Sequence, residues 1–130
     1  MAINFVARSR KNPINQTVKY YPAIQQNGSI DLKQVAKKIE KTSTVSSADI
    51  KAVLDSLQNV VIDTLQSGQS VRLGDLGSFR PTLNGKGSAK ADDCTASNIT
   101  RVRVCFTPST TMRHELSTDA LSFTKTGNAD

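Results

Sequence analysis

The sequence predicts an α+β fold with two amphipathic helices, a β-hairpin that carries a long basic connection, and a short helix near the end. Three observations predict it. Apolar residues recur at helical spacing in 30–41 and 46–67. They alternate with polar residues in 70–80 and again in 98–106, as in half-buried strands. The Thr-Pro pair at 107–108 is typical of a helix start.

The first predicted helix covers residues 30–41. Its apolar stripe consists of Leu32, Val35, Ala36 and Ile39. Asp31 or Ser29 can cap its start. We interpret the lysines on the opposite side as a solvated face, with DNA contact as the alternative; they are Lys33, Lys37, Lys38 and Lys41.

The second helix, over 46–67, has the stronger pattern. Ser46 and Asp49 resemble a capping box, and Gly68 is expected to end the helix in the left-handed conformation. The apolar residues at helical spacing are Ile50, Val53, Leu54, Leu57, Val60, Val61 and Leu65. This stripe is wider than the short preceding helix can cover, so it packs on the sheet, on a second copy of the chain, or on both.

The predicted hairpin turns at Gly74, Asp75 and Gly77, and a basic arm follows over about 80–104. Its middle, 84–97, is rich in Gly, Ser and Ala, and we expect a mobile loop there. Val102 and Val104 then alternate with arginines. From composition alone, an arm that follows phosphates and an ordinary surface hairpin with solvated charges are equally good interpretations.

The two ends of the chain are less patterned. Residues 1–29 predict two short strands, or an extended arm, with a loop at RKNPINQ and a turn at QNGS. In the last predicted helix, 107–118, Thr107 is the expected N-cap and Pro108 the first helical residue. Met112 and Leu116 are expected to face inward there. Leu121 and Phe123 suggest one more strand.

Length and charge restrict the class of protein. The 130 residues suit one domain, which we divide into a β-prone extension, 1–29, and the domain itself, 30–130. Lys and Arg number 17 against 11 acidic residues, for a net charge of +6, which favours an anionic partner: most often nucleic acid, less often a membrane or an acidic protein. The hydrophobic content is 37% with no Trp, so pairing of two copies is one way to bury more apolar surface.

The sequence gives little support for a membrane protein, a targeting peptide, a metal site or an enzyme. No apolar run approaches the ~20 residues that span a bilayer, so we expect a cytoplasmic protein without membrane contact. KNP and YYP interrupt the helix that a transit peptide would need. Cys94 and Cys105 lack metal-site spacing and are interpreted as reduced thiols, with a bridge across the hairpin as the alternative. His114, beside Glu115, belongs to no catalytic set, so we expect no enzyme, cofactor, metal or small-molecule substrate.

Two sequence motifs, one before and one after the basic arm, resemble motifs of the HU/IHF family of histone-like DNA-binding proteins. LGDLGSF, at 73–79, corresponds to the family's GFGTF or GxGxF turn. FTPS, at 106–109, corresponds to its FKPG or FxPS motif before the last helix. The resemblance covers about Ile30 to Leu116. The segments outside this range look like those of the HU-related group of Bacteroidetes type: the N-terminal segment contains RKNP and KYYP, and the C-terminal segment contains LSF.

The resemblance implies an IHF-like fold assembled as an intertwined homodimer, with two β-arms that reach around double-stranded DNA. By position, the shared dimer core would contain Leu54, Leu57, Val61, Leu76, Phe79 and Phe106. The DNA-contacting residues would be Arg80, Lys86, Lys90, Arg101, Arg103, Ser109, Thr110 and Arg113. It implies an architectural, largely sequence-independent protein of the bacterial nucleoid.

The sequence departs from the family's pattern at the arm tip. The family's RNP, whose proline wedges between base steps, has no counterpart between Asn84 and Asn98, and Asp92 and Asp93 add negative charge there. Asp75 also stands where the family has glycine. We expect weaker binding or gentler bending than in typical members. The alternative function is a dimeric interaction or scaffold protein on the same fold, with weak or lost DNA binding.

Overall fold

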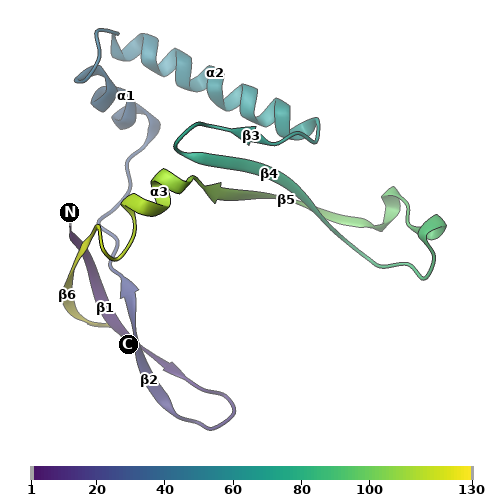
Figure 1. Cartoon of the computed structure of the whole chain (residues 1–130), viewed down its shortest axis with the longest axis horizontal. Helices are drawn as coiled ribbons and strands as arrows, with labels where there is room; N and C mark the ends of the chain where they lie inside the picture. The colour runs from purple at the N-terminus through teal and green to yellow at the C-terminus, as the bar shows by residue number, and fades with distance from the viewer. Residues whose placement is uncertain (1, 130) are drawn as a thin grey trace. The chain divides into compact units, whose positions relative to one another are not determined.

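A computed structural model describes residues 2–129, which form two compact units (Figure 1). Of the described residues, unit 1 contains 2–29 and 113–129, and unit 2 contains Ile30–Met112. Unit 2 begins at Ile30, and the division into an extension, 1–29, and a domain, 30–130, stays a prediction. The end of the chain groups with its beginning because the last strand pairs with the first.

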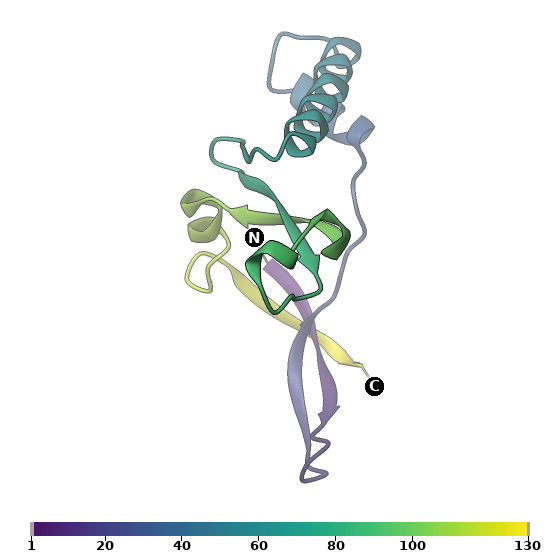
Figure 2. The ribbon, with the colours of Figure 1, turned by 90° about the vertical axis from the view of Figure 1, so that its right-hand side faces the viewer.

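Unit 1 is a three-stranded sheet in the order β2-β1-β6 (Figure 2). β1 (Ala2–Lys11) and β2 (Val18–Ile24) form an antiparallel hairpin, which confirms the strands predicted near the start of the chain. β6 (Ser122–Ala129) lies parallel to β1, with Ile3 opposite Phe123, and confirms the suggested final strand. Val6, at the middle of β1, is 7% exposed and is the centre of this small unit.

The helices predicted over 30–41 and 46–67 form in unit 2 as α1 (Leu32–Glu40) and α2 (Ser47–Gln66). Asp31 caps α1 in a reciprocal box with Gln34, in which each side chain accepts a backbone N–H, at 2.9 and 3.0 Å. Ser46 caps α2 by accepting the N–H of Asp49. These are local interactions between residues three apart, which is why the sequence indicates both helix starts.

The sheet of unit 2 has the order β3-β4-β5, with both pairings antiparallel. The strands are β3 (Val71–Arg72), β4 (Gly77–Gly85) and β5 (Ile99–Pro108). A tight turn joins β3 to β4. The N–H of Leu73 closes it by donating a hydrogen bond of 2.8 Å to the carbonyl of Gly77. The predicted turn is therefore present, but the strand before it is only two residues long.

The last helix begins later than the sequence predicts. β5 continues through Pro108, and α3 covers only Thr110–Glu115. Ser109, and not Thr107, caps it, because its hydroxyl accepts the N–H of Met112 at 3.0 Å. Thr107 is held in the sheet opposite Ser78, so it has no freedom to cap a helix. Leu116 was expected to face inward but lies beyond the helix end and is 61% exposed.

Very little apolar surface is buried within the chain. Among the described residues, the buried hydrophobic side chains are those of Val6, Ala36 and Ile50. Ala36 and Ile50 lie where α1 packs on α2. The rest of the α2 stripe remains accessible, with Val53 at 66% and Val60 at 59%. The lean core expected from composition is thus the most pronounced feature of the fold.

No helix in the described part of the chain is long and apolar enough to cross a membrane. Cys94 is exposed, Cys105 is half-buried beside Thr82 on the neighbouring strand, and both are free thiols.

We expect Gly77→Ala to destabilise unit 2 severely. Gly77 has a φ of 149°, and an added Cβ would collide with the carbonyl oxygen of Thr107 and lie 2.8 Å from the Phe106 ring. Backbone strain plus that collision should cost roughly 3 kcal/mol, measured by chemical denaturation. Gly87→Ala is the matched control, because its added Cβ meets nothing within 4 Å. Equal stability of the two variants would contradict the close packing of β4 on β5.

Candidate nucleic-acid interface

β4 and β5 extend as a two-stranded arm beyond the short strand β3 (Figure 1). The last residue of β4 that pairs with β3 is Phe79, whereas the pairing of β4 with β5 continues to Gly85 and Ile99. Residues 80–85 and 99–105 therefore have no third strand beside them. A two-stranded ribbon is marginally stable in water, so this arm serves poorly as a core element and is free to contact a partner.

One face of the arm is cationic. Residues opposite each other in an antiparallel pair point to the same face, and alternate residues share it. Arg80 is opposite Cys105, Thr82 opposite Arg103, and Asn84 opposite Arg101. Arg72 on β3 pairs with Ser78 and joins the same face. No acidic residue falls on it. The members of this cationic face are Arg72, Ser78, Arg80, Thr82, Asn84, Arg101, Arg103, Cys105 and Thr107.

The structure thus brings together three of the arginines that were predicted from the resemblance. Arg80, Arg101 and Arg103 are all exposed and lie on adjacent strands. Arg72 was not among the predicted site residues. Its signal was present, since it alternates with Val71 and Leu73, but only the pairing of β3 with β4 shows which face it joins.

The other face of the arm is apolar and open. Its members are Phe79, Pro81, Leu83, Val102, Val104 and Phe106. The rings of Phe79 and Phe106 lie 5.0 Å apart between centroids. Farther along the arm Leu83 is 61% and Val102 64% exposed. An open groove of about 510 Å³ runs from Pro81, Leu83 and Val102 to Leu65, Gln66 and Gly68 at the end of α2.

A second groove continues this surface along α2. It has a volume of about 320 Å³ and is lined by Leu57, Gln58, Val61, Ile62, Leu73 and Phe79. Of the residues predicted for a dimer core, Leu54, Val61 and Phe79 are half-buried. Leu57 is 38%, Leu76 55% and Phe106 45% exposed.

The tip of the arm, where the composition predicts a mobile loop, contains short turns and a set of side-chain hydrogen bonds. Two short 3₁₀ turns, η1 (Ala91–Asp93) and η2 (Ala96–Asn98), fill it. The Asn98 side chain donates to the carbonyl of Lys86 at 2.9 Å and to Ser88 Oγ at 2.7 Å. Its Oδ1 accepts the N–H of Thr95 at 3.2 Å. Asn98 thus connects both strands of the tip, a role that nothing in the local sequence indicates.

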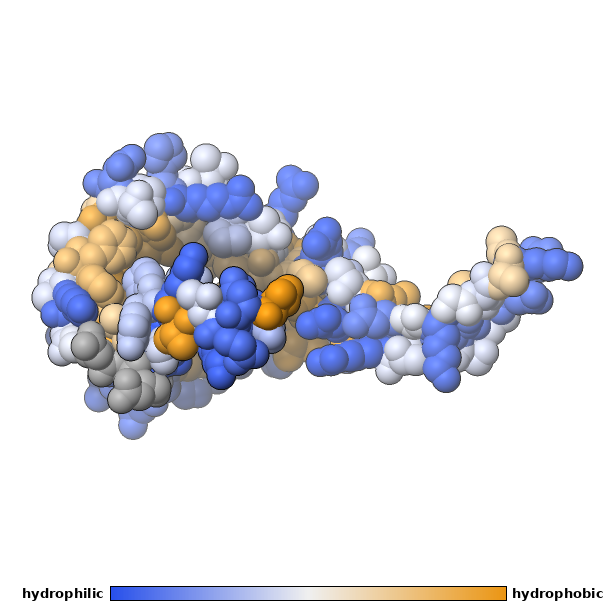
Figure 3. All heavy atoms as spheres, turned by 90° about the horizontal axis from the view of Figure 1, so that it is seen from below, coloured by the Kyte–Doolittle hydropathy of each residue, from blue (hydrophilic) through white to orange (hydrophobic). Residues whose placement is uncertain are grey.

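The predicted lysines of the tip are exposed but share it with acidic groups. Lys86 follows the last residue of β4, and Lys90 immediately precedes η1. Asp92 and Asp93 occupy η1 itself. Figure 3 shows the far end of the arm, at the right of the view, as a narrow projection with a mostly hydrophilic surface. The uninterrupted positive charge is therefore on the strands of the arm and not at its tip.

At the base of the arm, Ser109 is occupied by structural bonds. Its hydroxyl donates to the backbone carbonyl of Asp75 and accepts the N–H of Met112. Thr111 Oγ1 donates to Asp75 Oδ1 at 3.4 Å, so Asp75 ties the β3–β4 turn to α3. Thr110 is exposed at the first position of α3. Arg113 is also exposed but belongs to unit 1, so no geometry links it to the arm.

No group of three or more His, Cys, Asp or Glu side chains is placed to hold a metal ion within the described part of the chain. His114 is exposed in the last turn of α3.

Two helices, a small antiparallel sheet and a projecting two-stranded arm with one cationic face define an HU-type domain. The chain belongs to the HU-HIG family, described as an HU domain fused to wHTH, Ig, or glycine-rich motif, whose model matches residues 1–125. The resemblance to HU-type proteins stated from the sequence motifs is thereby confirmed. No curated protein matches the chain in sequence.

Two solved structures share this fold. A protein of Bacteroides vulgatus to which DNA binding is ascribed has a TM-score of 0.69 and 16% identity, over 98% of this chain. This chain spans 50% of the length of that protein. HU of Anabaena, solved with DNA, has a TM-score of 0.55 and 16% identity, and covers 68% of this chain and 99% of its own.

We expect Asn98→Ala to loosen the arm tip without affecting the rest of unit 2. The change removes the side-chain bonds to Lys86, Ser88 and Thr95, worth roughly 1 kcal/mol each. Amide hydrogen exchange should accelerate in residues 86–97, while the exchange of α2 is unchanged. Lys90→Ala, an exposed change in the same segment, should leave exchange as it is. Slow exchange in the Asn98 variant would show that the tip is held by other contacts.

Proposed function

We propose that this protein is an architectural, largely sequence-independent binder of double-stranded DNA in the bacterial nucleoid, and that it acts as a homodimer through its basic arms. The observation that carries the proposal is the two-faced arm. Arg80, Arg101 and Arg103 lie on one face, and a continuous apolar surface lies on the other. An arm of this kind can present charge to a polyanion while its apolar face packs against protein.

The cationic face is suited to phosphates more than to base edges. Its four arginines carry fixed charge, and no carboxylate on the same face competes for them. Its neutral members are short: Ser, Thr, Asn and Cys side chains that do not reach far beyond the strand. Contacts to phosphates position a protein on the duplex without reading sequence. Membership of an HU family and the fold shared with DNA-bound HU support duplex DNA as the polyanion.

The homodimer is supported by the apolar surface that one chain leaves uncovered. The α2 stripe and the apolar face of the arm meet along two adjoining grooves. A monomer rarely exposes a continuous apolar surface of this extent. Burying such a side chain fully contributes about 1.5–3 kcal/mol, so a second copy placed on α2 would supply the core that one chain lacks. Leu57, Val61 and Phe79 line that surface, as the family resemblance implies for the dimer core.

A second candidate function rests on the acidic tip. Asp92 and Asp93 reduce the attraction of the tip to phosphates, and no proline lies between residues 84 and 98 to wedge between base pairs. A protein that retained the dimer but bound DNA weakly would act as an interaction or scaffold protein. Binding to random duplex at low salt distinguishes the two functions, since only the first requires it.

We expect Arg101→Ala/Arg103→Ala to weaken binding equally on unrelated duplex sequences. For every ~6 phosphates that the wild-type dimer neutralises, log K should fall with log salt at a slope of roughly −5, and the double variant, which removes two arginines from each protomer, should reduce that slope by about 3–4. Anisotropy titration over a salt series measures both quantities. Lys37→Ala/Lys38→Ala removes the same charge from α1 and should have little effect. Loss confined to one sequence would indicate base readout and contradict the proposal.

We expect Leu57→Glu to separate the dimer. Two carboxylates would enter the shared core, and burying each unpaired costs several kcal/mol, so the dimer dissociation constant should rise more than about a hundredfold. Sedimentation equilibrium measures the mass directly. Asn59→Glu, two residues along α2 and on its opposite side, is the matched control and should remain dimeric. A wild-type protein that sediments as a single chain would overturn the homodimer.

A further inference from the structure

The end of the β1–β2 hairpin forms a second arm, in unit 1. The last residue of β1 that pairs with β6 is Arg8, opposite Ala129, whereas β1 continues to pair with β2 as far as Lys11 and Val18. Residues 9–20 therefore project as two strands and a loop without a third strand (Figure 2). Like the arm of unit 2, this segment buries little: every residue from Arg8 to Pro22 is exposed.

This second arm carries positive charge only. Residues 1–30 contain Arg8, Arg10, Lys11 and Lys19, with no aspartate or glutamate. Arg10 is opposite Lys19 in the register, so their charges lie on one face. Among the described residues, the ion pair found is that of Lys51 with Asp55, which lies elsewhere, so none of these four cations pairs with a described carboxylate. Unlike the tip of the β4–β5 arm, the second arm holds no carboxylate.

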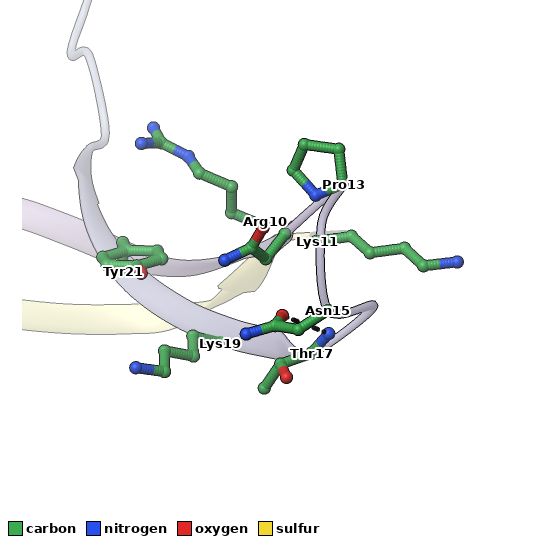
Figure 4. A pocket seen from close by; sticks show the side chains of 8 residues that line it. Arg10, Lys11, Pro13, Asn15, Thr17, Lys19 and Tyr21 are labelled. Atoms are coloured by element: carbon green, nitrogen blue, oxygen red, sulfur yellow. Dashed lines mark hydrogen bonds between the residues drawn. The ribbon is translucent and has the colours of Figure 1, made fainter.

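Three of these cations, Arg10, Lys11 and Lys19, line a hollow at the end of the hairpin. It has a volume of about 330 Å³ and is lined by Arg10, Lys11, Asn12, Pro13, Asn15, Thr17, Lys19 and Tyr21. Arg10 lies over the Tyr21 ring, with its guanidinium carbon 5.2 Å from the ring centroid, which steadies the long side chain. Figure 4 shows the Arg10, Lys11 and Lys19 side chains extending outward from the strands beside the loop.

The loop at the end is held in one shape by its own hydrogen bonds. The N–H of Asn12 donates to the carbonyl of Thr17 at 2.8 Å, and the Asn12 side chain accepts the N–H of Ile14 at 2.9 Å. The Asn15 side chain accepts the N–H of Thr17 at 3.0 Å. This arrangement presents Pro13 and Ile14 at the end, with Ile14 92% exposed. A preformed loop loses little conformational entropy on binding.

We propose that this second arm is a further site for double-stranded DNA: Arg10, Lys11 and Lys19 contact phosphates, and Ile14 enters the minor groove. Cations that flank an exposed apolar side chain are the combination that minor-groove proteins use. The inference rests on the proposed function for its ligand but uses residues of the other unit. An anionic membrane surface would attract the same cations. The apolar end is too small to insert firmly there, since interfacial binding requires a broad apolar face.

The charge contribution can be tested by a salt titration of the whole chain. Arg10→Gln/Lys11→Gln/Lys19→Gln should reduce the slope of log K against log salt by about 2–3 for each hairpin that contacts the duplex, and lower the affinity for a random duplex at least tenfold. Lys33→Gln/Lys37→Gln/Lys38→Gln removes the same charge from α1 and is the matched control. An unchanged slope in the hairpin variant, with the wild-type slope intact, would overturn the second arm and leave the proposed function standing.

The apolar contact has a separate readout. Ile14→Ser should lower affinity about fivefold with no change in salt slope, because it removes apolar contact and no charge. A photo-crosslinking amino acid at position 14 should form adducts with labelled duplex, whereas the same group at Val45, 44% exposed between α1 and α2, should not.

The crosslink should persist when Arg101 and Arg103 are replaced by Ala, which separates the second arm from the first. If the adducts are lost in the variant that lacks Arg101 and Arg103, position 14 has no DNA contact of its own, and the inference fails. A different result would also overturn the inference. If position 14 forms no crosslink with DNA and the wild type co-floats with vesicles rich in anionic lipid, the arm binds a membrane surface.

Discussion

The register of β4 against β5 determines most of what this protein can do. Because opposite residues share a face, a pairing of Thr82 with Arg103 and Leu83 with Val102 sorts charge to one side of the arm and apolar groups to the other. A slip of one residue would exchange the faces of an entire strand and mix the two surfaces. The register is fixed at the base of the arm, where Gly77 lets the strands approach and the Phe79 and Phe106 rings pack together.

The shortage of buried surface is the second constraint, and it follows from the first. A strand pair with one cationic and one apolar face has no core of its own, and α2 offers more apolar residues than α1 can cover. The grooves along Leu57 and Leu65 show where that excess lies. A polyanion on one side and a second copy on the other would satisfy both faces, which is why DNA binding and dimerisation are proposed together.

The two arms differ in how charge is distributed along them. The β4–β5 arm is basic on its strands, and Asp92 and Asp93 moderate its tip. The β1–β2 arm is basic up to its end, where Ile14 is exposed. Each tip is held by asparagine side chains that accept or donate backbone hydrogen bonds, Asn98 in one arm and Asn12 and Asn15 in the other. Defined loops at the ends of two-stranded ribbons suit a protein that contacts an extended ligand at several points.

The sequence by itself determined what depends on near neighbours. Both helices and the cap at Ser46 follow from residues a few positions apart, and the alternation of Arg101 and Arg103 with valines determines a two-faced strand. Only the tertiary structure decided what depends on distant pairing. Nothing local indicates that Phe123 lies beside Ile3, that Arg72 joins the cationic face, or that Ser109 rather than Thr107 caps the last helix. The reason is physical: helix caps and periodicity are set by interactions within one turn, whereas strand order and register depend on which distant segments meet.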